Sequence, residues 1–195
     1  VDASAEVRAL GRRVHAAAFD VAEPAAIDVF MKAVRAELGP AFALVANAGT
    51  ILLPDDVAHA DAARWDRTMA VNARAPYLFA TALLPAMLEA GRGRIVTVAS
   101  TAGLGGLPDR LCYVASKHAV VGLTRALAED ARRTPVTVNA VCPGAVRTRL
   151  TEGSRPGDER AGWLDADEVA ATVAHLVGPD GGHVHGAVIE LRDRG

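Results

Sequence analysis

Apolar runs of strand length alternate along the chain with longer segments that have helical periodicity. The predicted strands are residues 14–19, 42–49, 93–100, 136–144 and 186–191. The predicted helices are residues 27–38, 61–90 (one long helix or two abutting ones), 112–131 and 165–177. Strands that alternate with helices indicate βαβ units, and strands that are apolar throughout indicate a sheet covered on both faces. The pattern therefore predicts an α/β fold built around a parallel sheet.

The composition is that of one ordinary globular domain. Of the 195 residues, 51% are apolar and 23% are charged, and no repeat or linker divides them, so we expect a single domain over residues 1–195. The formal net charge is −2 with both signs mixed along the chain, which excludes neither enzymes nor binding proteins but gives no sign of a nucleic-acid or anionic-membrane partner. No apolar run reaches the roughly 18 residues of a membrane-spanning helix, and no signal peptide is recognisable, so a cytoplasmic location is the default expectation.

The cysteines and histidines do not have the spacing of a metal site. Cys112 and Cys142 are each flanked by apolar residues and are predicted to be small buried side chains. His183 and His185 stand two residues apart, but further ligands are not apparent around them. The sequence therefore predicts no bound metal.

Small, polar or turn-forming residues follow the predicted strands. In an open parallel sheet, ligands bind beyond the carboxyl ends of the strands. The residues at these positions are Asp20, Asn47, Ala48, Gly49, Ser100, Thr101, Pro143 and Gly144. They are candidates for a site that accepts a flat ligand, although the same residue types are common in turns that bind nothing.

One Tyr and one Lys stand four residues apart in the predicted helix 112–131, in a chain that contains two of each. Residues i and i+4 share a helix face, so Tyr113 and Lys117 point the same way near the start of that helix. A neighbouring ammonium favours the phenolate, so we expect Lys117 to lower the pKa of Tyr113 and make it a general acid or base for an alcohol or a carbonyl. Ser100, at the end of the preceding strand, can hold the substrate oxygen against the phenol.

These residues, together with others in the same order, resemble the classical subgroup of the short-chain dehydrogenase/reductase family. The matching stretches are NAG (47–49), VN (71–72), Ser100, YVASK (113–117) and VNAVCPGAVRT (138–148). Residues 115–130 are similar to those of 3-oxoacyl-carrier-protein reductases and polyketide ketoreductases. The resemblance implies a doubly wound, three-layer αβα, Rossmann-like fold. It also implies hydride transfer between a nicotinamide cofactor and a small-molecule alcohol or ketone.

The resemblance assigns four catalytic roles. Tyr113 would donate or accept the proton, and Lys117 would assist it and hold the nicotinamide ribose. Ser100 would orient the substrate oxygen. Asn72 would hold a water in a proton relay behind Lys117.

The implied cofactor is NAD or NADP, bound by three groups of residues. Asp20 and Val21 would lie by the adenine, with Asn47, Ala48 and Gly49 along the adenosine ribose. The nicotinamide side would be lined, besides Tyr113 and Lys117, by Pro143, Gly144, Val146 and Thr148. Asp2 would take the adenine-ribose hydroxyls, which favours NAD over NADP.

The sequence departs from the family pattern in two places. The strand, the Gly-rich TGxxxGxG turn and the helix that bind pyrophosphate are not in it, and its first residue is Val1. We therefore expect either a fragment of a longer protein or a member that lacks its first βα unit, with very weak cofactor binding and aggregation-prone sheet edges in the second case. The predicted substrate lid, loop 149–164, is short and indicates a small or open pocket.

Two other functions stay open at this point. The chain could be a truncated paralogue, catalytically weak or inactive, that acts as an oligomer partner. It could also be an epimerase or dehydratase that uses the same Tyr–Lys pair. By analogy with the family, the helices 61–90 and 112–131 would pair across a homodimer or homotetramer interface.

Overall fold

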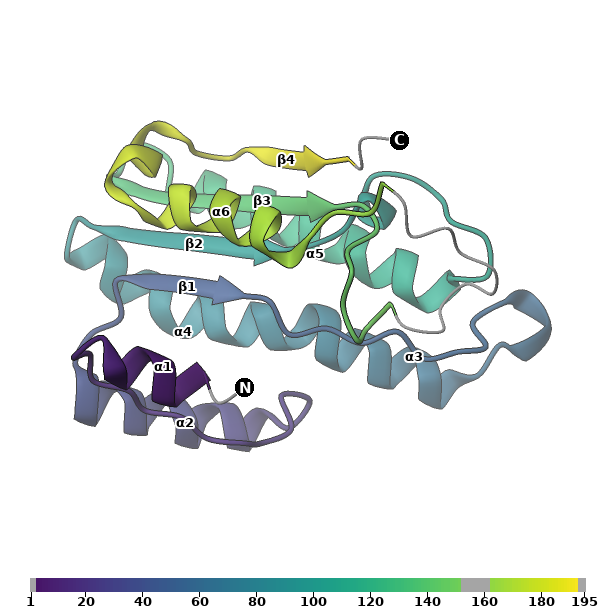
Figure 1. The fold of residues 1–195 in the computed structure, drawn as a ribbon, viewed down its shortest axis with the longest axis horizontal. Coiled ribbons are helices and arrows are strands. Elements are labelled where there is room, and N and C mark those ends of the chain that lie inside the picture. The colour runs from purple at the N-terminus through teal and green to yellow at the C-terminus, as the bar shows by residue number, and fades with distance from the viewer. Residues whose placement is uncertain (1–2, 152–161, 193–195) are drawn as a thin grey trace.

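A four-stranded parallel sheet lies between two layers of helices in the computed structural model, which describes residues 3–151 and 162–192 (Figure 1). The strands are β1 (Ala43–Ala46), β2 (Gly93–Val98), β3 (Val136–Pro143) and β4 (Val188–Leu191). They follow one another across the sheet in chain order, and each neighbouring pair is parallel. The helices α4 (Ala75–Glu89) and α5 (Leu111–Asp130) cover one face, and α6 (Ala166–Val177) covers the other. The predicted parallel, three-layer αβα architecture is confirmed.

The helices α2 and α6 begin at residues that are favoured in the first turn of a helix. The helix α2 (Pro24–Leu38) starts at a proline, three residues earlier than predicted, because a first turn needs no proline N–H. Asp165 and Glu168 form a capping box at the start of α6. The remaining elements are α1 (Ala3–Ala9) and the short 3₁₀ turns η1 (Val57–His59), η3 (Thr101–Gly103) and η4 (Pro179–His183). Across the described ranges, none of the helices has the length and apolar character needed to cross a membrane.

The predicted helix 61–90 forms as one helical path with a widened turn inside it. It consists of α3 (Ala62–Met69), the π-helical turn η2 (Ala70–Arg74) and α4. The N–H of Ala75 bonds to the carbonyl of Ala70, five residues back. Pro76 has no N–H with which to close the ordinary bond four residues back, onto the Asn72 carbonyl. The π turn thus sits at Asn72, in agreement with the frequent use of such turns at functional sites.

Residues 14–19, predicted as a strand, form neither strand nor helix. The rings of His15 and Phe19 pack against Phe30 of α2, with centroid distances of 5.6 and 5.1 Å. The three alanines between them, residues 16–18, are exposed and offer little surface to a sheet. The prediction is wrong here because this apolar run covers α2 rather than extending the sheet.

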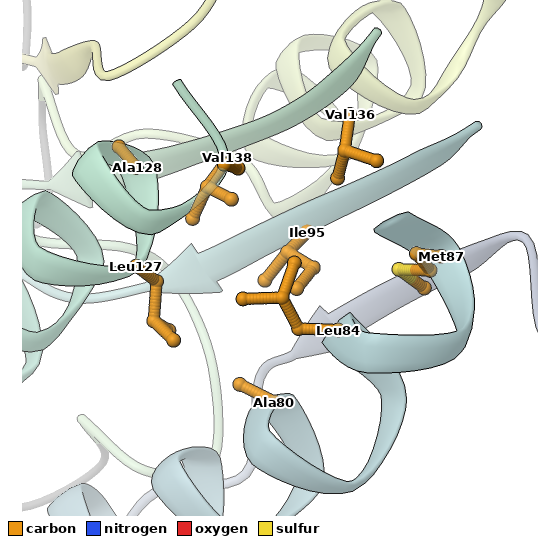
Figure 2. Close-up of a cluster of buried hydrophobic side chains, with 9 residues drawn as sticks. Ala80, Leu84, Met87, Ile95, Leu127, Ala128, Val136 and Val138 are labelled. Atoms are coloured by element: carbon orange, nitrogen blue, oxygen red, sulfur yellow. The ribbon is translucent and has the colours of Figure 1, made fainter. Parts of the chain in front are cut away.

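The main hydrophobic core fills the space between the sheet and the helices α4 and α5 (Figure 2). Ile95 and Val138 have no exposed surface and project from β2 and β3, toward Leu84 of α4 and Leu127 of α5. On the opposite face, Leu176 of α6 is fully buried against the sheet. Every residue of β3 is buried, including the polar Thr137 and Asn139, because β3 lies inside the sheet with helices on both faces. Packing on both faces fixes the strands whose carboxyl ends form the candidate site.

Candidate active site

Two elements bring Ser100 and Tyr113 together. Ser100 follows β2 and caps η3, where its Oγ accepts the N–H of Ala102 at 3.1 Å. Tyr113 lies in the first turn of α5 and is 8% exposed. The Ser100 hydroxyl and the Tyr113 phenol line the same cavity, and Ser100 lies close enough to lower the pKa of the phenol. The strand end and the helix start thus converge as the sequence predicted.

The electrostatic state of the phenol differs from the prediction. Burial raises the pKa of Tyr113, while the nearby Ser100 hydroxyl and the Arg110 charge lower it by less. Lys117 Nζ lies 5.7 Å from the centre of the Tyr113 ring and is not among the groups that shift this pKa. The expected net lowering by Lys117 is therefore wrong, because loss of hydration outweighs every interaction that favours the phenolate.

Lys117 is a buried cation at the floor of the site. Its side chain is 4% exposed, and Nζ donates a hydrogen bond to the carbonyl of Val98 at 3.0 Å. Burial lowers the pKa of Lys117 to about 8. Within the described residues Lys117 forms no ion pair with a carboxylate, so donors remain on Nζ for a bound molecule.

Asn72 connects three segments behind the site. Its Oδ1 accepts the N–H of Thr50 at 2.7 Å, and its Nδ2 donates to the Thr50 carbonyl at 3.0 Å and to Ser116 Oγ at 2.9 Å. Ser116 Oγ in turn donates to the carbonyl of Tyr113 at 2.7 Å. A Cβ placed on Gly49 would lie 3.5 Å from Asn72 Oδ1 and 3.6 Å from Lys117 Nζ, so all three residues meet at one point. The side chain of Asn72 thus braces the site, and its relay role stays a prediction.

A cavity of about 440 Å³ opens at the carboxyl ends of β1, β2 and β3. It brings together nine of the residues predicted from sequence. These are Asn47, Gly49, Ser100, Tyr113, Lys117, Pro143, Gly144, Val146 and Thr148. Ala48 and Val21 instead line an apolar cavity between β1 and α2, which Asn47 also borders.

Asp20 does not belong to the walls of the main cavity. Its carboxylate accepts a hydrogen bond from Arg67 at 2.7 Å and the N–H of Ala22 at 2.9 Å. The Arg67 contact, and after it the Ala22 contact, lower the pKa of Asp20. The predicted adenine-side residue is thus engaged by the protein itself. Asp2 lies outside the described residues.

Both ends of the predicted lid, residues 149–164, contact the segment after β3, and near the start of the lid the Thr151 hydroxyl donates a hydrogen bond to the Val146 carbonyl at 2.6 Å. Leu164 forms a parallel bridge with Val146, its N–H bonds to the Ala145 carbonyl, and Trp163 beside it is 9% exposed. Residues 152–161 lie outside the described residues. A second cavity of about 420 Å³ adjoins this region and shares Ser100 and Tyr113 with the first.

Neither the histidines nor the cysteines gather as metal ligands. Among the described residues, His, Cys, Asp and Glu form no group of three or more that could hold a metal ion. His185 bonds the N–H of Val138 and the carbonyl of Ala128, so it fastens β3 to the end of α5. Cys112 and Cys142 are buried free thiols, as the sequence predicted.

The family assignment follows from comparison with known proteins. A family model described as short chain dehydrogenase matches residues 1–159. The chain belongs to this family. The matched range contains all the residues that the sequence placed at the site.

Curated relatives of this family member include a D-beta-hydroxybutyrate dehydrogenase from Rhizobium meliloti, 35% identical over 150 residues. Another is 2-(S)-hydroxypropyl-CoM dehydrogenase 3 from Xanthobacter autotrophicus, 45% identical over 127 residues. The matches cover 77% and 65% of this chain but only 58% and 49% of the relatives, so the chain spans about half their length.

Solved structures agree with the fold. One is the crystal structure of a blue fluorescent protein from a metagenomic library in complex with NADPH. It matches with a TM-score of 0.88 and 34% identity, and the match covers 97% of this chain and 78% of that one.

Sequence reasoning missed two residues of this family member that support Tyr113. Ser116 links Asn72 to the Tyr113 carbonyl, and it carries no pattern beyond its place between Tyr113 and Lys117. Asp55 is 3% exposed and accepts the N–H groups of Cys112 and Tyr113. Its distance along the chain from α5 left no local signal by which to find it.

Proposed function

We propose that this protein transfers a hydride between a nicotinamide cofactor and a small alcohol or carbonyl compound, with Tyr113 as the general acid or base. The observation that carries the proposal is the meeting of the Ser100 hydroxyl, the Tyr113 phenol and the Lys117 ammonium at one cavity. Such a phenol exchanges a proton with a substrate oxygen that an adjacent hydroxyl holds in place. Membership of the short chain dehydrogenase family supports the same chemistry.

The residues present fit a nicotinamide nucleotide. Lys117 offers free donors on a buried ammonium, which suits the hydroxyls of a ribose. Gly49 leaves the wall beside Lys117 and Asn72 without a side chain, and Pro143 and Gly144 line the same cavity. When bound, the cofactor supplies or accepts the hydride. NAD is the slightly preferred form on sequence grounds, and the solved relative contains NADPH.

The catalytic step proposed for the chain's own groups is a proton transfer at the Tyr113 oxygen. In carbonyl reduction the phenol donates its proton to the substrate oxygen, and in alcohol oxidation the phenolate accepts it. The Ser100 hydroxyl donates a hydrogen bond to the same substrate oxygen. A buried phenol with a raised pKa carries its proton near neutral pH, which is the form that donates to a carbonyl oxygen.

The second cavity is our proposed substrate side. It borders Ser100 and Tyr113 and also carries Arg110, Glu190 and Arg192. The Arg192 and Glu190 side chains form an ion pair at 3.1 Å. Polar groups at this mouth suit a substrate with hydrogen-bonding groups beyond its reacting carbon.

The test is turnover, followed by the absorbance of the reduced nicotinamide with NAD(H) and NADP(H) and a panel of ketones and alcohols. Replacement Tyr113→Phe is expected to lower kcat by about 10²–10⁴-fold, because it removes the proton donor. Tyr77→Phe is the matched control, since Tyr77 is the other tyrosine, is 49% exposed and lies on α4 away from the cavity. Equal activity in both variants would remove Tyr113 from the mechanism.

The rivals predict different results in the same assay. An epimerase or dehydratase would convert its substrate with no net change in reduced nicotinamide. A catalytically inactive oligomer partner would show no turnover in any assay. The meeting of Ser100, Tyr113 and Lys117 at one cavity, with Asn72 beside them, favours the enzyme.

We further propose that copies of the chain associate through α4 and α5. Tyr77 is 49% exposed, and a hollow that Tyr77 shares with Ala73, Ala119 and Leu123 runs across both helices. An aromatic ring beside apolar residues suits an interface core, and Asp66 and Arg74, which line the same hollow, suit its polar rim. Sedimentation of the parent protein and of Tyr77→Arg tests this, with loss of the dimer or tetramer expected in the variant.

A further inference from the structure

The backbone N–H groups in the first turn of α5 all donate hydrogen bonds to one residue that is distant in the chain, Asp55. The carbonyl of Asp55 accepts the N–H of Leu111 at 2.9 Å, and its carboxylate oxygens accept those of Cys112 at 3.0 Å and Tyr113 at 3.1 Å. The next N–H, that of Val114, makes the first bond inside the helix, to the Arg110 carbonyl. The N–H groups that a helix start leaves without intrahelical partners are thus satisfied by Asp55.

Asp55 is a buried residue whose position at α5 does not depend on an ion pair with a surface side chain. It is 3% exposed, lies 58 positions before Tyr113 in the chain, and forms no ion pair among the described residues. Arg110, at the usual capping position, provides no side-chain cap. Burial, and next a hydrogen bond to Asp55, raise the pKa of the Cys112 thiol to about 11. The buried carboxylate is thus balanced by N–H and S–H donors of α5 and by the positive end of that helix.

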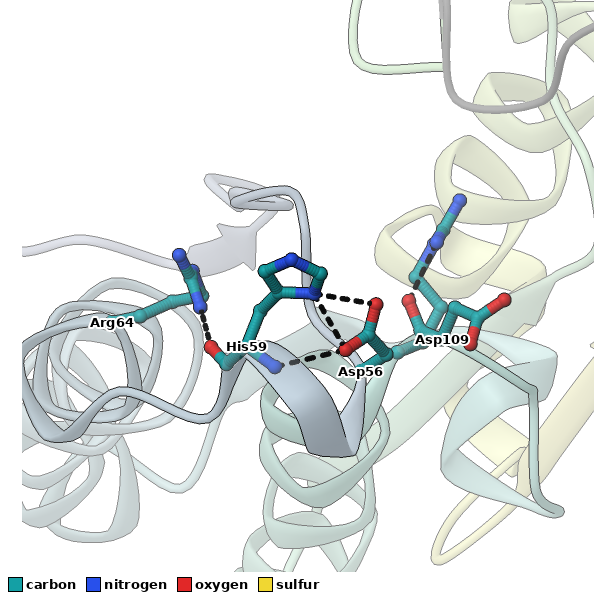
Figure 3. A network of polar contacts seen from close by, with 5 residues as sticks. Asp56, His59, Arg64 and Asp109 are labelled. Carbon is teal, nitrogen blue, oxygen red and sulfur yellow. Dashed lines mark hydrogen bonds and ion pairs between the residues drawn. The ribbon is translucent and has the colours of Figure 1, made fainter.

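The segment that carries Asp55 is held independently of α5. The carboxylate of Asp56 accepts the N–H of His59 at 2.9 Å and contacts its ring Nδ1 at 2.8 Å, and Arg64 donates to the His59 carbonyl. Figure 3 shows this network beside Asp109, which lies just before α5. The network fixes the Asp55 segment to the start of α3. Asp55 therefore connects two helices: its segment is bonded to α3, and its own carboxylate is bonded to α5.

We propose that Asp55 is a positioning residue that sets the first turn of α5 and thereby holds the Tyr113 phenol at Ser100. Tyr113 is one of the residues whose N–H Asp55 binds, so the backbone from which the phenol side chain extends toward Ser100 is held in place by that bond. The role rests on the proposed function only for its kinetic consequence. The placement of the phenol is measurable without turnover.

The test is an absorbance titration of the phenol in a Tyr77→Phe background, where Tyr113 is the sole tyrosine. Asp55→Ala frays the first turn and exposes the ring, so the Tyr113 pKa is expected to fall from its raised position toward the ordinary value of about 10. Asp55→Asn keeps one side-chain oxygen that can accept an N–H, so the pKa of Tyr113 is expected to fall less in this variant. It also serves as the readout if Asp55→Ala does not fold.

Glu168→Ala is the matched control. Glu168 also caps a helix, since its carboxylate accepts the N–H of Asp165 at the start of α6, on the opposite face of the sheet from α5. It is expected to lower stability and leave the Tyr113 pKa unchanged. An unchanged Tyr113 pKa in Asp55→Ala, with stability lowered as in Glu168→Ala, would reduce Asp55 to a helix cap. Equal falls in Asp55→Ala and Asp55→Asn would assign the effect to lost charge and overturn the positioning role.

Kinetics separate this proposal from the proposed function. If the protein turns over, Asp55→Ala is expected to lower kcat by about 10²-fold with little change in the KM for the cofactor, because the reacting group is misplaced while the cofactor walls remain. If the parent protein shows no turnover but the titration behaves as expected, the proposed function fails and the positioning role stands.

Discussion

At the scale of single residues, the site depends on two polar groups that burial has changed in opposite ways. Burial raises the pKa of the Tyr113 phenol and lowers that of the Lys117 ammonium to about 8. The sequence identified both residues from their spacing. The direction that the sequence predicted for the pKa of Tyr113 is wrong, because a helix wheel shows which side chains are neighbours but not how much water surrounds them.

The lowered pKa of Lys117 makes a prediction about stability. Between about pH 8 and 10.5 the unfolded chain keeps the Lys117 proton that the folded chain has released, so the free energy of unfolding is expected to rise with pH there. The rise is on the order of 3 kcal/mol for a change of this size. Urea unfolding at a series of pH values measures it.

Lys117→Met is expected to abolish this rise. Lys32→Met is the control, because Lys32 is the other lysine and its side chain is 75% exposed beside Asp28. A rise that survives in Lys117→Met would show that another group causes it.

At the scale of elements, the site exists because η3 lies directly against α5. A Cβ on Gly103 would lie 2.6 Å from the carbonyl oxygen of Lys117, so an alanine there cannot fit without moving one of the two elements. Ser100 caps η3, and Tyr113 and Lys117 belong to α5. The separation of these elements therefore sets the distance between the reacting groups.

Gly103→Ala is expected to lower the free energy of unfolding by about 1–3 kcal/mol, as overpacking does, and to weaken the Ser100–Tyr113 contact. Gly122→Ala is the matched control on α5, where a Cβ meets open space. It is expected to raise stability by roughly 0.5–1 kcal/mol, since alanine favours a helix more than glycine does. Chemical unfolding and the phenol titration check both. Equal stability of the two variants would contradict the close contact.

At the scale of the whole molecule, the sheet is well covered over β2 and β3 and open at β1. Phe42 and Val45 are 44% and 43% exposed, and within the described residues β1 pairs with β2 alone. An apolar strand with unpaired backbone groups invites pairing with another chain. The purified 195-residue chain is therefore expected to self-associate through this edge.

Val45→Lys is expected to reduce this association, because a charged side chain on an edge opposes pairing. Val29→Lys, at a position on α2 that is 68% exposed, introduces the same charge away from the sheet and is expected to change it little. Light scattering over a range of concentrations measures both. The same degree of association in the two variants would place the contact elsewhere.

The local pattern of the sequence determined the strands β1 to β4, the helices α2 to α6 and the spacing of Tyr113 and Lys117. Hydrophobic period, capping residues and helix geometry act over a few positions, so a single segment carries them. The assignment failed at residues 14–19, where an apolar run packs on α2.

Tertiary structure alone decided what joins distant segments: the Asn72–Ser116 bond, the engagement of Asp20 by Arg67, and the hold of Asp55 on α5. It also decided the protonation of the site, because burial depends on how the layers close and not on the order of residues.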